Sequence, residues 1–355
     1  MSRFFSERFA SLVPYVPGEQ PQDMQYVKLN TNESPFPPPL EVLEAVAGES
    51  GRLQLYSDPD GRLLRRKLAE VCGVSEEQVI LGNGSDEILY LAFMAFADEA
   101  HPIVCPDISY GFYTVLVNLL NLPCERIPLR EDYRIAAEDY CGIGKTVVIA
   151  NPNAPTGLYL RLEEIERIVA SNPENVIIVD EAYVNFGAES ALPLLQKYDN
   201  LLVVQTFSKS RSLAGARLGF AAGSPALIRD LNTLRCSINP YNVNRMTLAA
   251  GLASLENDAY NRANCCTVAE NRAWTVKELQ ARGFTVLDSR ANFLFARKDG
   301  IDGEGLYLAL KKRGVLVRHF RDDRIADFIR VTIGSREQMG IFIERLDEIL
   351  KESMA

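Results

Sequence analysis

The chain has 355 residues, of which 38 are basic and 47 acidic, so its formal net charge is −9. This acidic balance argues against nucleic acid as the main partner, because nucleic acids bind basic faces. Hydrophobic residues make up 47% of the chain and charged residues 24%, as in a globular protein that needs neither disulfides nor metal to fold. The length predicts about two domains.

The histidines and cysteines narrow the chemistry further. Two histidines exclude a multi-histidine metal site, and the seven cysteines, which form no CxxC pair, indicate free thiols in a reducing compartment. No apolar run is long enough to span a bilayer, and the first residues lack the apolar core of a signal peptide. The expected location is therefore the cytoplasm.

The N-terminal segment is rich in proline, which prevents a continuous helix or a central strand. We expect residues 1–45 to form an extended arm that joins the small domain described below. From residue 60 onward, segments with a helical pattern alternate with short apolar strands. Leu64, Leu68 and Val71 lie at helical spacing, and Gly73 can end that helix.

Short apolar strands separated by helices follow. The expected strands are QVIL (78–81), PIVC (102–105), 146–150, 175–180 and 201–206. We expect helices at 162–170 and after the turn GNG, where Ser85 can cap the helix. Such strands indicate a mostly parallel sheet with helices on both faces, which we assign to a large α/β domain at 46–270.

The pattern changes after residue 240. A long helical stretch is expected up to about Arg282, with Gly283 as its cap. Beyond it the sequence predicts the strands FTVLD, NFLFAR, VLVR and FIRVTIG, with the helix GLYLALKKR among them and a final helix to about Lys351. We therefore expect a small C-terminal α+β domain at 271–355.

Chemically useful residues follow several of the predicted strands, where open parallel sheets bind their ligands. GNGSDE (82–87) follows the first strand, NPNAPTG (151–157) the third, DEAY (180–183) closes the fourth, and the fifth runs into SKSRSLAGARLG (208–219). Each pattern alone is typical of a turn or a helix cap. Their order and spacing together indicate one site.

The residue types at this edge suggest one cofactor. A lysine such as Lys209 can lose its proton in a desolvated site and attack a carbonyl. Arg217 and the helix N-terminus after Gly84 can hold a phosphate. Asp180 leaves an apolar strand and needs a cationic partner, such as a protonated pyridine. Phosphate, aldehyde and pyridinium together describe pyridoxal phosphate.

The ordered motifs resemble the fold-type I pyridoxal phosphate-dependent aminotransferases over nearly the whole chain. PYVPG (14–18), KLNTNESPF (28–36), LYSDPDG (55–61) and FIRVTIG (328–334) are similar to the histidinol-phosphate aminotransferases within that family. The resemblance implies a large, mostly parallel α/β domain, a smaller α+β domain, an N-terminal arm, and a homodimer with shared active sites. It also implies pyridoxal 5'-phosphate as the cofactor and no metal.

The resemblance implies three catalytic residues. Lys209 would bond the cofactor aldehyde and carry a proton to and from the substrate, Asp180 would keep the pyridine nitrogen protonated, and Tyr183 would donate to the ring oxygen O3′. Tyr110 would stack on the ring. The family usually has asparagine directly before Pro-Thr-Gly, where this chain has Ala154, so Asn153 is expected to take over that contact.

The remaining implied contacts fall into two groups. The further cofactor contacts are Gly84, Ser85, Asp86, Thr206, Ser208, Arg217 and, from the neighbouring subunit, Tyr56. The implied substrate contacts are Tyr15, Asn32, Asn292, Arg318 and Arg330, with the two arginines and Tyr15 meeting a phosphate.

The implied reaction is a reversible transamination of imidazole acetol phosphate with glutamate, giving L-histidinol phosphate and 2-oxoglutarate in histidine biosynthesis. An aromatic or broad-range aminotransferase and a decarboxylase of a phosphorylated amino acid remain alternatives. A ligand-sensing regulator would need a DNA-binding module, and no basic helix-turn-helix precedes residue 30. A nicotinamide enzyme would need G-x-G-x-x-G, which GNGSDE lacks.

Overall fold

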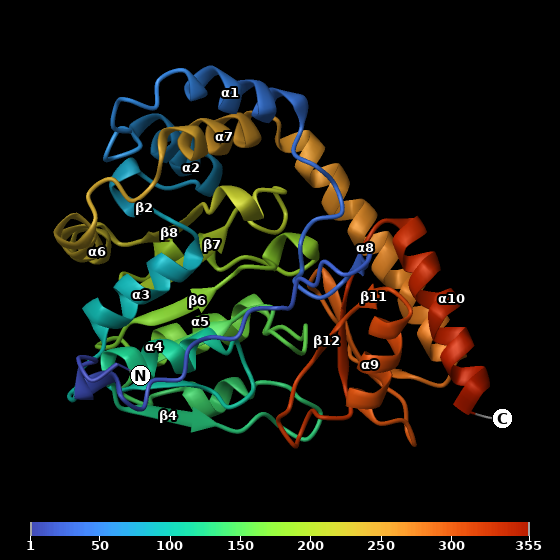
Figure 1. Cartoon of the computed structure of the whole chain (residues 1–355). Helices are drawn as coiled ribbons and strands as arrows, with labels where there is room; N and C mark the ends of the chain where they lie inside the picture. Colours follow the sequence, from blue (N-terminus) through green and yellow to red (C-terminus); the bar gives the residue numbers. More distant parts are fainter. Residues whose placement is uncertain (1, 354–355) are drawn as a thin grey trace.

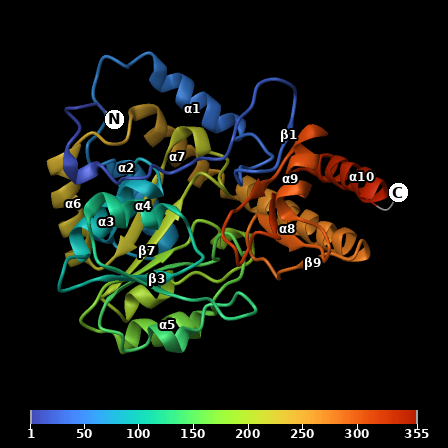
Figure 2. The same cartoon turned by 60° about the horizontal axis from the view of Figure 1, so that its bottom comes forward.

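The computed structural model describes residues 2–353, which build one sheet of seven strands, one of four and one of two (Figure 1). The N-terminal and central segments form the part around the seven-stranded sheet, and the C-terminal segment packs beside it. Figure 2 shows the same division from a second direction. In both views the C-terminal helices lie away from the large sheet.

The seven-stranded sheet has the order β2-β8-β7-β6-β5-β3-β4. Its strands are β2 Val79–Gly82, β3 Ile103–Pro106, β4 Cys124–Ile127, β5 Thr146–Ala150, β6 Ile177–Asp180, β7 Leu201–Thr206 and β8 Gly219–Gly223. Only β8 is antiparallel to its neighbours, β2 and β7. The predicted mostly parallel sheet is confirmed, whereas β4 and β8 were not expected. Apart from Phe220, β8 (GFAAG) consists of glycine and alanine, which are depleted in strands, so its pairing with β2 and β7 stabilises it more than its propensity does.

Helices cover both faces of this sheet. They are α2 Arg62–Cys72, α3 Ser85–Phe96, α4 Phe112–Leu120, α5 Leu162–Ser171 and α6 Pro225–Ile238. The helices α3, α4 and α6 share one apolar core with one face of the strands, and α5 shares another core with the opposite face. The short 3₁₀ helices are Glu7–Phe9, Glu76–Gln78, Ala137–Tyr140, Val184–Phe186, Leu192–Gln196 and Ala214–Ala216.

Two helix ends test the predicted capping residues. Helix α2 ends at Gly73 in the left-handed conformation (φ 68°), as expected. The prediction that Ser85 caps α3 is wrong, because Gly84 occupies the cap position with φ 81° and Ser85 is the first helical residue. A side chain at Gly84 would begin 2.6 Å from the Arg217 guanidinium, so the close approach of that arginine requires glycine here.

The chain between the sheets forms two helices, not the single stretch expected. Helix α7 (Arg245–Glu256) ends at Asn257, and α8 (Asp258–Ala281) begins immediately after it. Helix α1 (Leu40–Ser50) packs against α7 at the top of Figure 1. The predicted domain limits at residues 45 and 270 therefore fall inside α1 and α8, and the division into domains stays a prediction.

The C-terminal part is an antiparallel sheet covered by helices. Its order is β12-β13-β10-β9, with β9 Thr285–Val286, β10 Phe293–Arg297, β12 Arg318–His319 and β13 Ile329–Thr332. Helices α9 (Gly303–Lys312), α10 (Arg336–Ser353) and α8 close its apolar core. The arm strand β1 (Val27–Lys28) pairs in parallel with β11 (Val315–Leu316), which ties the N-terminal segment to this part.

Within residues 2–353, no helix is long and apolar enough to cross a membrane. The same residues contain no group of three histidine, cysteine or acidic side chains that could hold a metal ion. All seven cysteines are free thiols.

Candidate active site

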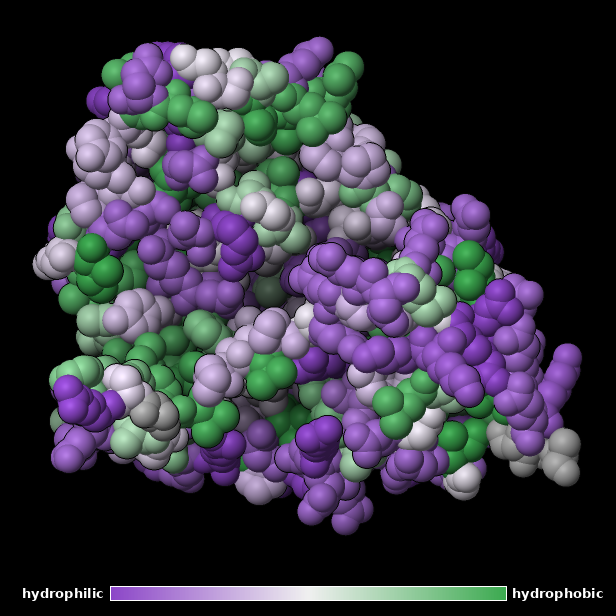
Figure 3. Space-filling view, viewed as in Figure 1, coloured by the Kyte–Doolittle hydropathy of each residue, from purple (hydrophilic) through white to green (hydrophobic). Residues whose placement is uncertain are grey.

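A cavity of about 660 Å³ opens at the carboxyl ends of β5, β6 and β7. It lies between the seven-stranded and four-stranded parts, where Figure 3 shows a recess near the centre of the molecule. Segments far apart in the sequence wall it, including the arm, the start of α3, the strand ends and β12–β13. The cavity brings together the predicted residues Tyr15, Asn32, Ser85, Asp86, Tyr110, Asp180, Tyr183, Thr206, Ser208, Lys209, Arg217, Arg318 and Arg330.

Lys209 follows the last residues of β7 and reaches into the cavity. Its Nζ donates to the Thr31 carbonyl oxygen at 3.1 Å and lies 6.0 Å from the centre of the Tyr183 ring. Loss of contact with water lowers the pKa of this amine to about 8, and the nearby charge of Arg330 acts in the same direction. A larger fraction of the amine is therefore unprotonated near neutral pH than for an exposed lysine, which favours attack on a carbonyl.

Asp180 lies at the end of β6 on the cavity floor and is 3% exposed. Its Oδ2 accepts from the Tyr113 hydroxyl at 2.9 Å, and its Oδ1 accepts from the Ala182 amide at 3.2 Å. Burial raises the pKa of this carboxyl to about 6 although both hydrogen bonds oppose the change. Asp180 is thus a buried carboxylate at neutral pH, and a cation bound beside it would be strongly favoured.

Tyr113 is a site residue that the sequence prediction missed. It is 2% exposed and its ring contacts Tyr110 edge to face, with centroids 5.6 Å apart. Tyr110 lies just before α4 and Tyr113 is the second residue of that helix, so the only signal in the sequence was the nearness of the two tyrosines along the chain. The bond to Asp180 depends on how α4 packs against β6, which the spacing does not show.

The Tyr183 hydroxyl is held from the arm. Asn32 donates from Nδ2 to this hydroxyl at 3.0 Å and has a left-handed backbone, with φ 56°. The Thr332 hydroxyl donates to Asn32 Oδ1 at 3.0 Å, and Asn292 Nδ2 donates to the Asn32 carbonyl oxygen at 2.9 Å. Asn292 is not among the residues that line the cavity. Its contact with Asn32 indicates that it positions Asn32, and we do not expect it to touch the substrate directly.

One end of the cavity has the features of an anion site. Ser85 and Asp86 open α3, whose free N–H groups attract negative charge. Arg217 (φ 56°) donates to Asp86 Oδ2 at 3.2 Å, and the Tyr110 hydroxyl donates to Asp86 Oδ1 at 3.0 Å. The Thr206 hydroxyl donates to Ser208 Oγ at 3.0 Å beside them. This end therefore offers a guanidinium, hydroxyls and helix amides to a phosphate.

The structure does not place Asn153 in the predicted role. Its Nδ2 donates to the Ile108 carbonyl oxygen at 3.0 Å and to Thr156 Oγ1 at 3.2 Å, while its Oδ1 accepts from Ser109. Both hydrogens of the Asn153 amide therefore form hydrogen bonds within the cavity wall, and the residues that line the cavity here are Ala154 and Pro155. The expectation that Asn153 replaces the missing asparagine is therefore corrected, because its side chain braces the loop.

Tyr56 lies outside the cavity of its own chain. It is 79% exposed and stacks on Tyr241, with ring centroids 4.4 Å apart and planes 20° apart. Gly84 also lies outside the lining as described, directly behind Arg217. Within one chain, therefore, Tyr56 does not reach the site.

Replacing Lys209 with methionine is expected to raise the free energy of unfolding of the cofactor-free protein by about 3 kcal/mol at pH 7. The reason is that burial lowers the lysine pKa from 10.5 to about 8 and so penalises the charged amine. Below pH 8 folded and unfolded chains both carry the proton and the penalty is complete. Between pH 8 and 10.5 the folded chain loses the proton first, so the gain should shrink.

Urea denaturation at pH 7 and at about pH 10 measures this difference. Lys197→Met is the control, since the Lys197 amine lies on the surface beside Glu166 at 3.0 Å. A Lys209→Met protein no more stable than the original at pH 7 would contradict the expectation.

Comparisons with known proteins show which family the chain belongs to. Residues 24–346 match the family Aminotransferase class I and II. A histidinol-phosphate aminotransferase of Brachyspira hyodysenteriae is 46% identical over 353 residues, covering 99% of this chain and all (100%) of that protein. One from Clostridium acetobutylicum is 45% identical over 351 residues, with 99% of this chain and 100% of that protein covered.

A solved structure is similar in fold. The histidinol-phosphate aminotransferase from Sinorhizobium meliloti, in complex with pyridoxal-5'-phosphate, superimposes with a TM-score of 0.90 at 24% identity, covering 100% of this chain and 99% of that one. The family match spans most of the chain, and the sequence relatives align over their full length. The chain belongs to the class I and II aminotransferases.

Proposed function

We propose that the chain is a pyridoxal phosphate-dependent aminotransferase that moves an amino group from glutamate to imidazole acetol phosphate, giving L-histidinol phosphate and 2-oxoglutarate. The observation that carries the proposal is a single cavity with an amine of lowered pKa, a buried carboxylate and an anion site at one end, and two arginines from β12 and β13 at the other. Relatives of 46% identity over their full length bear the name histidinol-phosphate aminotransferase.

The charges of the cavity residues and their positions along the cavity fit pyridoxal phosphate. Asp180 is a buried carboxylate whose hydrogen bonds come from neutral groups, so a protonated pyridine nitrogen would supply its missing cation. The start of α3 and Arg217 would hold the phosphate, and Lys209 would meet the aldehyde. When bound, the cofactor supplies a ring that accepts the electrons released as the substrate carbon loses its proton.

The chain's own residues then orient the reactants and move the proton. Lys209 would take the proton from the substrate carbon and return it on the cofactor side, and a pKa of about 8 suits this proton transfer near neutral pH. Asp180 would keep a proton on the ring nitrogen. Tyr183, whose hydroxyl accepts from Asn32, would donate to the ring oxygen. Ala154 lines the cavity at the position where the family resemblance leads us to expect an asparagine.

Two arginines would meet the substrate's acidic end. Arg330 donates to the Asn30 carbonyl oxygen at 3.0 Å, and its buried Nε has no hydrogen-bond partner within the described chain. Burial lowers its pKa, and the guanidinium lies 5.2 Å from the centre of the Phe293 ring. Arg318 lies in the same wall and donates to Val16 and Pro17 of the arm. An anion would satisfy these donors, as a phosphate in one substrate and a carboxylate in the other.

An exposed apolar face supports a homodimer. Large apolar side chains are exposed on α1, on α2, in the segment between these helices and at the end of α6 and just after it: Leu40, Leu43, Leu53, Leu55, Tyr56, Leu63, Ile238 and Tyr241. Figure 3 shows hydrophobic residues gathered over α1 at the top. We propose that a second copy covers this face and that Tyr56 reaches the partner's cofactor phosphate.

The seven free thiols favour the cytoplasm as the location.

The enzyme loaded with cofactor is expected to react with L-histidinol phosphate in a single half-reaction. L-Histidinol, which lacks the phosphate, should react with a kcat/KM lower on the order of 10³-fold, because the arginines would be left unpaired. Absorbance of the bound cofactor measures both reactions. Arg318→Gln is expected to reduce this preference about tenfold.

Arg321→Gln is the control, since Arg321 is exposed and lies 3.7 Å from Glu304 on the surface. Equal rates with and without phosphate would refute phosphate recognition. A preference for a plain aromatic amino acid would identify an aromatic aminotransferase, and release of carbon dioxide a decarboxylase.

A further inference from the structure

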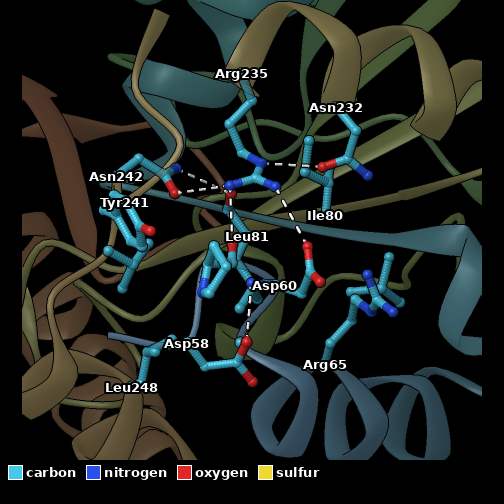
Figure 4. A pocket seen from close by; sticks show the side chains of 14 residues that line it. Asp58, Asp60, Arg65, Ile80, Leu81, Asn232, Arg235, Tyr241, Asn242 and Leu248 are labelled. Carbon is cyan, nitrogen blue, oxygen red and sulfur yellow. Dashed lines mark hydrogen bonds and ion pairs between the residues drawn. The ribbon is translucent and has the colours of Figure 1, made fainter. Parts of the chain in front are cut away.

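Arg235 on α6 is a buried arginine outside the cavity described above. It is 5% exposed, and Figure 4 shows its guanidinium at the centre of a small pocket. Its Nε donates to Asn232 Oδ1 at 2.9 Å, and its nearest carboxylate, on Asp60, lies 3.7 Å away. Burying a guanidinium is costly unless its donors are satisfied, so the remaining partners indicate what it does.

Those partners belong to two loops. Arg235 Nη1 donates to the Pro59 carbonyl oxygen at 2.9 Å and to the Pro240 carbonyl oxygen at 3.1 Å. The first loop follows Tyr56, and the second carries Tyr241. One planar side chain therefore joins two backbone segments far apart in the sequence, a task that suits the fork of donors on arginine.

The joined loops present an aromatic pair to solvent. Tyr56 and Tyr241 stack with centroids 4.4 Å apart, and they are 79% and 42% exposed. Ser57 adds a second link between the loops by donating to the Val243 carbonyl oxygen at 2.7 Å. The relative position of the two rings therefore depends on the contacts buried beneath them.

The second loop is also attached to the chain's own anion site. Asn242 donates to Glu87 Oε2 at 2.6 Å, and the same oxygen accepts the Asn83 amide at 2.6 Å. Arg235 approaches Asn242 Oδ1 at 3.5 Å. Loss of Arg235 could therefore act in two ways. The outward route displaces the tyrosine pair and affects the active site of a second copy, and the inward route displaces Asn242 and affects the chain's own anion site.

We propose that Arg235 is a positioning residue that acts in trans, by setting the place of Tyr56 at the active site of a second copy of the chain. The inference rests on the proposed function, in which Tyr56 reaches the partner's cofactor phosphate. The distances favour the outward route. Arg235 donates to Pro59 and Pro240, in the loops that carry the two tyrosine rings, at 2.9 and 3.1 Å, whereas its distance to Asn242 Oδ1 is 3.5 Å.

Hybrid dimers separate the two routes. In the first hybrid, one chain is unaltered and the other carries Lys209→Ala with Arg235→Gln, so the only lysine-bearing site receives its Tyr56 from the altered chain. In the second hybrid, one chain carries Arg235→Gln and the other Lys209→Ala, so the lysine-bearing site receives an unaltered Tyr56 loop. Absorbance of the lysine-bound cofactor then reports on one site in each hybrid holoenzyme.

The expected result is that the cofactor leaves the first hybrid about tenfold faster than unaltered enzyme, and leaves the second at the unaltered rate. Arg235→Lys should not restore the rate, because one ammonium cannot replace the fork. If Arg235→Gln fails to fold, Tyr241→Leu replaces it in both hybrids, because this surface change leaves Arg235 in place. The same difference between the first and the second hybrid is then expected. Arg229→Gln, on the exposed side of the same helix, is the matched control.

The opposite pattern, with loss confined to the second hybrid, would overturn the proposal in favour of the inward route through Asn242. Equal loss in both hybrids, together with a lower melting temperature, would reduce Arg235 to a stabilising residue. A chain that sediments as a monomer would overturn the proposed dimer itself. If Tyr56→Phe speeds release in trans but Arg235→Gln does not, only the role of Arg235 fails.

Discussion

Replacing Lys209 with alanine is expected to lower kcat about 10⁴-fold, because the variant loses both the amine that meets the cofactor and the base that moves the substrate proton. The geometry behind this is one amine of lowered pKa inside the cavity, held 3.1 Å from the Thr31 carbonyl oxygen. Steady-state transamination and the absorbance of the loaded enzyme measure the two losses separately. The variant should still bind the cofactor through its phosphate, only more weakly.

Lys197→Ala provides the matched control for the removal of a lysine amine. Its Nζ pairs with Glu166 on the surface, so both activity and the cofactor spectrum should be unchanged. Multiple turnovers by Lys209→Ala at the original rate, with the original spectrum, would refute the role of this residue and with it the proposed reaction.

Replacing Asp180 with asparagine is expected to lower kcat on the order of 10³-fold. The amide keeps the size of the carboxylate and can still accept from Tyr113, but it cannot stabilise a positive charge on the cofactor ring. In the cofactor-free protein burial raises the Asp180 pKa to about 6, so the carboxylate loses its charge as the pH falls through 6. Cofactor affinity of the original protein should fall over the same range, and that of the variant should not.

Titration of the cofactor from pH 5 to 8 checks both statements. Glu181→Gln is the control, because Glu181 is the adjacent buried carboxyl, yet it accepts from Ser190 and the Ala191 amide and lies outside the cavity lining. Loss of stability without loss of kcat is expected there. An Asp180→Asn enzyme with the original kcat would show that the carboxylate does not act on the ring.

The sequence and the structure agree most closely where local chemistry decides the outcome. Strands β5 and β7 have the predicted bounds, since short segments this rich in apolar residues are typical of a sheet covered on both faces. Gly73 ends α2 because few other residues adopt its backbone conformation. The same logic placed Lys209 and Asp180 at one edge, since parallel strands end on the same side.

The disagreements arise where a side chain or strand had a choice of partners. Asn153 was expected at the cofactor, but its amide instead satisfies the Ile108 carbonyl oxygen and Thr156 inside the wall. Apart from Phe220, strand β8 consists of glycine and alanine, which are depleted in strands, and it is stabilised by its pairing with β2 and β7. Tyr113 was overlooked because its bond to Asp180 joins a helix to a strand.

The order of the motifs by itself determined the family resemblance, the alternation of strands and helices, and the lysine and carboxylate at the strand ends. Only the tertiary structure decided that Asn32 holds Tyr183, that Asn153 faces away and that Arg235 joins two distant loops. The physical reason is that apolar patterning and turn chemistry act between near neighbours along the chain. A buried hydrogen bond is chosen among all the donors and acceptors that folding brings together.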